Sequence, residues 1–142
     1  MTRTTLALVL ALFLSASCGS EKKSPAESTD DAALAERWVV LYRQYAAAME
    51  KAGTDCAAAA AAVRQVNAQN ADLIAADKPR IRALRADPAK RAWLDENYKP
   101  KLGAELDRMA PTLDRCRGNP EMSAALAEGA FEKRAAGADQ PR

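Results

Sequence analysis

Three cysteines, Cys18, Cys56 and Cys116, are the side chains of this sequence best suited to covalent chemistry. The chain contains no histidine, so it cannot supply a Ser-His-Asp or Cys-His nucleophilic site or a histidine metal site. Asp95 and Glu96 are adjacent acids, but successive residues of a helix point about 100° apart and do not converge on a substrate. We therefore predict no catalytic residue, no metal site and no cofactor, and a protein that is not an enzyme.

The first cysteine follows a stretch typical of export signals. Arg3 precedes an uninterrupted apolar run over residues 6–14, and small residues then lead to Cys18. A helix needs about 20 apolar residues to cross the ~30 Å hydrocarbon layer of a membrane. The run is much shorter than that, so it indicates a secretory signal rather than a membrane-spanning helix.

Residues 14–18, Leu-Ser-Ala-Ser-Cys, resemble the lipobox of bacterial lipoproteins. The resemblance implies cleavage before Cys18 and attachment of fatty acids such as palmitate to that residue, so that acyl chains hold the protein in a membrane. Gly19 stands where an aspartate would retain a lipoprotein in the inner membrane, which implies the outer membrane of the cell envelope, facing the periplasm. A signal peptide ending at Ala16 or Ser17, or an uncleaved anchor, are the alternatives.

Charge and composition restrict both partner and fold. The 142 residues include 21 basic and 19 acidic side chains, a net charge of +2, whereas nucleic-acid-binding domains are strongly basic, so no nucleic-acid partner is expected. Alanine, the best helix former, is abundant, and the β-branched residues that favour strands are scarce. The chain is long enough for one domain with one core. The composition predicts an all-α fold.

An acylated Cys18 would leave Cys56 and Cys116 as a pair in an oxidising compartment, where a disulfide is the default expectation. They are 60 positions apart in the sequence, and closing such a loop stabilises the fold by about 4 kcal/mol in the chain-entropy description. A helix-start signal, Asp87 followed by Pro88, lies midway between them. Two helical limbs of equal length that reverse at this turn would place the cysteines side by side.

Apolar residues recur every three or four positions in three long segments, as in helices that pack lengthwise. The second should kink or restart near Asp77 because of Pro79, and Pro100 and Pro111 should bend or split the third. The fold prediction is an antiparallel bundle of three long, proline-kinked helices plus one short C-terminal helix, with one disulfide. The apolar positions expected to pack together include Leu34, Trp38, Leu41, Tyr45, Ala59, Val63, Val66, Leu94, Tyr98, Leu102, Leu106, Met109, Leu113, Met122 and Ala125.

Four segments make up the predicted domain organisation. Residues 1–17 are the signal peptide, and residues 18–29 are the lipidated cysteine with a polar, flexible tether. A tether of about ten such residues reaches very roughly 17–19 Å, which keeps the domain near the membrane; a pro-peptide is the alternative. Residues 30–134 form the helical bundle, and residues 135–142 form a disordered tail.

Basic side chains cluster around the expected turn, with Asp87 as the only acid among them. If the helices run up, down and up, this tip lies at the tethered end and could contact anionic lipid head groups or an anionic wall polymer, at about 1 kcal/mol per basic residue. The alternative is a solvated helix end whose arginine stems cover Ile81 and Leu84. The six basic residues are Lys78, Arg80, Arg82, Arg85, Lys90 and Arg91.

Residues 30–131 are similar to small, Ala-rich helical lipoproteins and secreted proteins that carry one cysteine pair. The shared features are Cys56 at the start of a helix and residues 109–116 followed by Gly118, Asn119 and Pro120. This resemblance implies no activity. We expect a lipid-anchored, non-enzymatic envelope protein with an interaction or structural role and an unknown protein partner. The alternative is a periplasmic carrier or chaperone-like module that binds an apolar ligand or an unfolded chain between its helices.

Overall fold

The computed structural model describes residues 29–131, and every regular element in that range is an α-helix. The all-α class expected from the composition is confirmed. The predicted signal peptide, Cys18, the tether up to residue 28 and the tail 135–142 lie outside the described residues. The helices are α1 (Thr29–Ala52), α2 (Cys56–Gln69), α3 (Ala71–Ala86), α4 (Pro88–Asn97), α5 (Lys99–Arg115) and α6 (Pro120–Glu128).

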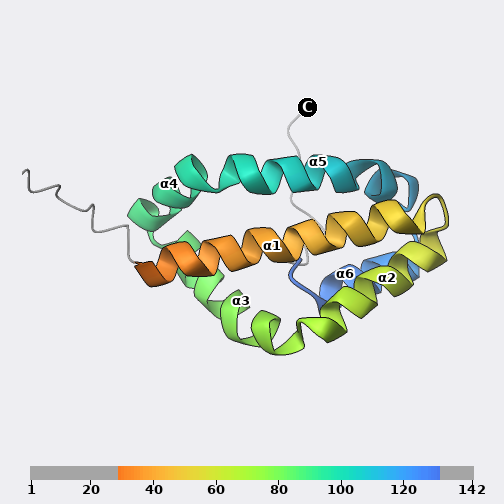
Figure 1. The fold of residues 1–142 in the computed structure, drawn as a ribbon, viewed down its shortest axis with the longest axis horizontal. Coiled ribbons are helices and arrows are strands. Elements are labelled where there is room, and N and C mark those ends of the chain that lie inside the picture. Colours follow the sequence, from red (N-terminus) through yellow and green to blue (C-terminus); the bar gives the residue numbers. More distant parts are fainter. Residues whose placement is uncertain (1–28, 132–142) are drawn as a thin grey trace, which may run out of the picture.

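Helix α1 is the central element of the fold. It runs along the molecule with α4 and α5 on one side and α2 and α3 on the other (Figure 1). Its 24 residues make it about 36 Å long. Leu34, Trp38, Leu41 and Tyr45, predicted to lie on one apolar face, are each at most 3% exposed. Because α2 and α5 both pack directly against α1, this face forms the middle of the hydrophobic core.

Three of the turns between the described helices, those after α1, α3 and α5, lie at residues suited to end or cap a helix. Gly53 directly follows the last residue of α1 and adopts φ +68°. A residue without a side chain reaches this conformation without strain, so a glycine suits the end of this helix. Asp87 accepts hydrogen bonds from the backbone of Ala89 at 2.9 Å and of Lys90 at 3.2 Å, and so caps α4. Asn119 caps α6 in the same way. The expected reversal at Asp87 and Pro88 is therefore a true helix boundary.

The helix count differs from the prediction, because each of the two long limbs after Gly53 is divided. Of the two outcomes expected near Asp77, a kink or a restart, the restart does not occur: Pro79 lies inside α3, on its exposed side, and the break comes earlier, at Asn70. The Asn70 amide donates to the Val66 carbonyl at 2.8 Å and to the Gln44 side chain of α1 at 2.7 Å. These contacts hold the Asn70 backbone away from helical geometry, at φ −118° and ψ 20°.

The other limb divides at Tyr98, next to Pro100. Tyr98 has φ −122° and separates α4 from α5, and Pro100 lies in the first turn of α5. A proline ring clashes with the carbonyl four residues before it, so a bend at this point is expected. Pro111, by contrast, lies inside α5 without ending it.

Cys56 and Cys116 form the predicted disulfide, with their Cα atoms 5.5 Å apart. The bond joins the start of α2 to the end of α5, at the end of the molecule opposite the α3–α4 turn (Figure 1). Beside it, α6 packs on α2 and completes the core. The predicted cysteine pairing is confirmed.

One predicted core position is wrong. Leu106 is 42% exposed, and its neighbour Glu105 is buried instead. The Glu105 carboxylate pairs with Arg43 of α1 at 3.2 Å and with Arg108 on its own helix. These ion pairs place Glu105 toward α1 and leave Leu106 at the surface.

Of the described helices, none is long and apolar enough to cross a membrane.

Candidate functional site

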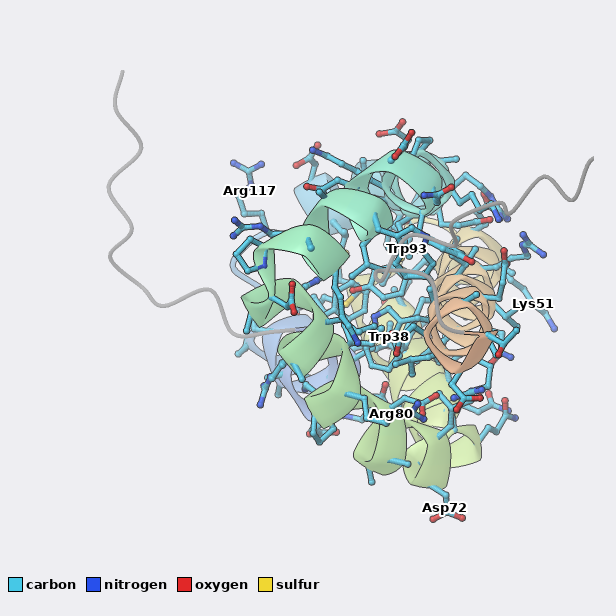
Figure 2. The ribbon with its side chains drawn as sticks, turned by 90° about the vertical axis from the view of Figure 1, so that its left-hand side faces the viewer. Trp38, Lys51, Asp72, Arg80, Trp93 and Arg117 are labelled. Atoms are coloured by element: carbon cyan, nitrogen blue, oxygen red, sulfur yellow. A yellow bond between two sulfur atoms is a disulfide. The ribbon has the colours of Figure 1, made fainter. Side chains whose placement is uncertain are left out.

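A groove opens between the first half of α1, the end of α3, α4 and the first half of α5, with a volume of about 520 Å³. Ligand pockets in proteins are typically roughly 300–1,000 Å³, so this volume suits a small organic ligand. Figure 2 looks at the molecule from the end where α1 begins and shows Trp38 between α1 and α3. The groove is lined by Ala35, Trp38, Ile81, Arg85, Arg91, Leu94, Asp95, Tyr98, Lys99, Leu102, Gly103 and Leu106.

Small residues on α1 and α5 contribute to the space. Ala35 of α1 and Gly103 of α5 both line the groove. A Cβ atom built at Gly103 would meet no atom within 4 Å, so this position faces open space. The bend at Tyr98 gives α4 and α5 different directions, and the groove lies beside it.

Aromatic and aliphatic side chains form the inner surface of the groove. Trp38 and Ile81 are 3% and 5% exposed, so the surface that they offer is held in place by the core behind it. Tyr98 packs against Trp93, with ring centroids 5.2 Å apart, and its hydroxyl donates to the Ala32 carbonyl at 3.4 Å. These contacts fix the orientation of the Tyr98 ring. The inner surface is therefore apolar and preformed.

The edge of the groove is cationic. Arg85 of α3, Arg91 of α4 and Lys99 of α5 line it, together with one carboxylate, Asp95. Within residues 29–131, none of these three cations has an ion-pair partner within 4.0 Å. Many other cations of the fold are paired, for example Arg37 with Asp77 at 2.9 Å. The groove thus combines an apolar interior with positive charge at its edge.

Two of the six basic residues predicted to contact an anionic surface make contacts within the fold. Lys78 donates to the Gly129 carbonyl at 2.6 Å and to the Phe131 carbonyl at 3.4 Å, beyond the end of α6. Lys90 pairs with Asp31 of α1 at 2.9 Å. This second contact places the start of α4 beside the start of α1. We assign both lysines a role in holding helices together.

The four arginines of the predicted tip lie in different surroundings. Arg80 is 3.8 Å from the buried carboxylate of Asp77, on its own helix. Arg82 lines a separate depression between α2, α3 and α6. Arg85 and Arg91 line the groove. The structure therefore brings two of the six predicted residues together at one site, and distributes the others over the fold.

The buried carboxylates connect α1 to its neighbours. Asp77 accepts two hydrogen bonds from Arg37, at 2.9 and 3.0 Å, and these bonds raise the pKa of the Arg37 guanidinium. Glu105 accepts from Arg43 at 3.2 Å, and Asp31 is also paired across helices. Each carboxylate is less than 9% exposed and has a cation beside it. These pairs explain the burial of the charges, and we assign them a structural role.

Sulfur ligands and acidic clusters give no second site in the described part of the chain. Met49, Met109 and Met122 are at most 2% exposed and belong to the hydrophobic core. No group of three or more Cys, Asp or Glu side chains among residues 29–131 is arranged to hold a metal ion. Another depression, between α1 and α2, is lined mainly by alanine and glutamine and offers no aromatic surface.

Several groove residues were not predicted as a site. Ala35, Lys99 and Gly103 show no motif, and their common position depends on how α1, α4 and α5 meet. The one local signal was Gly103, because a glycine inside a helical pattern costs about 1 kcal/mol relative to alanine. Comparisons with protein-family models, with curated proteins and with solved structures find no match. The function must therefore be argued from the groove itself.

Proposed function

We propose that this protein is a lipid-anchored, non-enzymatic module of the cell envelope that binds an apolar ligand in the groove between α1, α3, α4 and α5. The sequence leaves two functions open, an interaction or structural role and a carrier-like role, and the groove favours the second. The observation that carries this proposal is a preformed apolar pocket of about 520 Å³ with Trp38 on its inner surface. Trp38 and Tyr98 distinguish this groove from the depressions between α1 and α2 and between α2, α3 and α6, neither of which is lined by an aromatic residue.

The size of the groove is compatible with useful affinity. Each methylene removed from water contributes about 0.8 kcal/mol, so a chain of twelve contributes roughly 10 kcal/mol before any cost. Association costs at least about 4 kcal/mol in lost translational and rotational freedom. The remainder, at most about 6 kcal/mol, corresponds to a dissociation constant of roughly tens of micromolar or weaker. Such affinities suit a carrier that takes up and releases its ligand.

The membrane attachment is part of the same proposal. The lipobox-like residues before Cys18 support a signal peptide, acylation of Cys18 and anchoring at the outer membrane. Ala35, which lines the groove, lies within the first two turns of α1, about 9 Å along the helix axis from Thr29. The tether would therefore keep the groove near the membrane surface, where apolar ligands are concentrated.

The antiparallel course of the two limbs also belongs to this proposal. Two features support it: the disulfide between Cys56 and Cys116 and the capped turn at Asp87. In this arrangement α2 and α3 run from the disulfide to the turn, and α4 and α5 run back from the turn to the disulfide. In that arrangement the groove lies at the turn end of the hairpin and the disulfide closes the other end.

Binding of N-phenyl-1-naphthylamine, a neutral apolar fluorophore, tests the proposal. The exported full chain carrying Cys18→Ser is titrated, so that no acyl chain of its own competes. We expect saturable binding with one site per chain. Gly103→Leu should reduce the affinity at least tenfold, because its side chain fills the groove; the matched control Ala104→Leu adds the same side chain at an exposed position outside it. Absence of saturable binding, or equal affinity in both variants, would refute the proposed function.

A further inference from the structure

The three groove cations that have no ion-pair partner within residues 29–131 come from three different helices. Arg85 lies in the last turn of α3, Arg91 in the first turn of α4 and Lys99 at the start of α5. Other cations among the described residues have carboxylate partners: Arg43 pairs with Glu105 and Arg37 with Asp77, for example. Only Asp95 adds negative charge to the lining of the groove. Its electrostatic character is therefore positive, at the edge of an apolar surface.

A ligand that complements this surface has two parts. Its apolar part covers Trp38, Ile81 and Leu102 inside the groove, and its polar part carries negative charge toward the arginines at the edge. Guanidinium groups bind carboxylates and phosphates with paired, charge-assisted hydrogen bonds, which favours an anionic head over a neutral one. A flat surface of basic residues would attract anions without selecting for an attached chain.

Resting on the proposed function, we propose that the ligand of this groove is a single-chain lipid with an anionic head group, a carboxylate or a phosphate. The acyl chain lies along the apolar interior, and the head group lies between Arg85 and Arg91, with Lys99 adding positive charge. Asp95 limits the net attraction and disfavours heads of high negative charge. No bond is made or broken, so the ligand is bound and released unchanged.

The test compares four ligands with twelve-carbon chains, using the exported full chain carrying Cys18→Ser. The charged ligands are kept below their micelle concentrations and dodecanol below its solubility limit. They are dodecanoate, lauroyl lysophosphatidic acid, dodecanol and dodecylammonium. We expect the two anionic ligands to bind at least tenfold more tightly than dodecanol, and dodecylammonium to bind most weakly. The carboxylate and phosphate ligands distinguish the two possible head groups by their relative affinity.

Charge variants then locate the head group. Arg85→Gln with Arg91→Gln should abolish the tenfold preference for anionic ligands over dodecanol. Lys51→Gln with Arg117→Gln removes the same charge from exposed positions outside the groove and should leave the preference intact. Asp95→Asn should increase the affinity for both anionic ligands severalfold, because it removes the one repulsive group.

The outcomes separate this inference from the proposed function. If dodecanol binds as tightly as dodecanoate, the inference is wrong while the proposed function stands. If anionic ligands bind Gly103→Leu as tightly as the parent chain, they bind the surface outside the groove, and the inference is overturned. If none of the four ligands binds, both proposals fall.

Discussion

Removal of the disulfide provides a quantitative test of the hairpin. Cys56 and Cys116 are 60 positions apart, and the bond joins the start of α2 to the end of α5. In the chain-entropy description, opening a loop of this length lowers the free energy of unfolding by about 4 kcal/mol, because the unfolded chain becomes less restricted. For a domain of about a hundred residues, each kcal/mol corresponds to about 4–8 °C, so the melting temperature should fall by roughly 15–30 °C.

Urea unfolding of the exported protein measures this change directly. The oxidised parent chain is compared with Cys56→Ala/Cys116→Ala and with the parent after reduction, and the two opened forms should agree within about 1 kcal/mol. Their slopes against urea should exceed that of the oxidised chain, because the opened unfolded state exposes more surface. A stability difference below 1 kcal/mol between the oxidised and opened forms would show that the closure contributes little to the fold.

The same comparison separates stability from binding. The disulfide lies at the end of α1 opposite the groove, and the position of Ala35 is about 26 Å along the helix axis from that of Ala52. The opened variant should therefore bind N-phenyl-1-naphthylamine with unchanged affinity at a temperature where it remains folded. Loss of binding in a folded, opened variant would contradict the independence of the two ends.

Three further predictions concern the core. Arg37→Ala leaves the buried Asp77 carboxylate without its hydrogen-bonded partner and should cost about 1–3 kcal/mol in urea unfolding; unchanged stability would contradict the structural role of this pair. Burial raises the pKa of the Tyr45 hydroxyl above its ordinary value of 10.0, so the folded state holds this proton more tightly than the unfolded state. The contribution of this proton to the free energy of unfolding is thus complete below about pH 10 and declines as the pH rises through the folded pKa. Tyr45→Phe should reduce that decline, and a variant whose stability changes with pH as the parent's does would contradict the raised pKa. Gly129→Ala should destabilise the fold measurably in thermal unfolding, because its Cβ would overlap the Asn67 side chain and the Tyr45 hydroxyl; an unchanged melting temperature would contradict this contact.

The parts of the fold that follow from local chemistry could be predicted from the sequence. The helix ends at Gly53 and Asp87 depend on residues only a few positions apart, and the structure contains both. The disulfide follows from the number of cysteines left to pair, and it too is present. The apolar repeat likewise identified the face of α1 that includes Trp38 and Tyr45. These features needed no knowledge of which helices meet.

The parts that depend on contacts between distant residues could not be predicted. The break at Asn70 depends on a hydrogen bond to Gln44 of α1. The burial of Glu105 in place of the expected Leu106 depends on the ion pair between Glu105 and Arg43. The groove depends on how α1, α3, α4 and α5 meet, although a glycine at position 103 was visible. A periodic pattern defines a helical face but not the partner that covers it.

Contact between a bound chain and Trp38 is the most direct test that the groove is a ligand site. The chain has two tryptophans, so Trp93→Phe leaves Trp38 as the only one, and a bromine-labelled dodecanoate quenches a tryptophan that it touches. We predict saturable quenching of Trp38 in the Cys18→Ser/Trp93→Phe chain, and its loss when Gly103→Leu is added. Absence of quenching, or quenching that persists with Gly103→Leu, would contradict the assignment of this groove as the binding site.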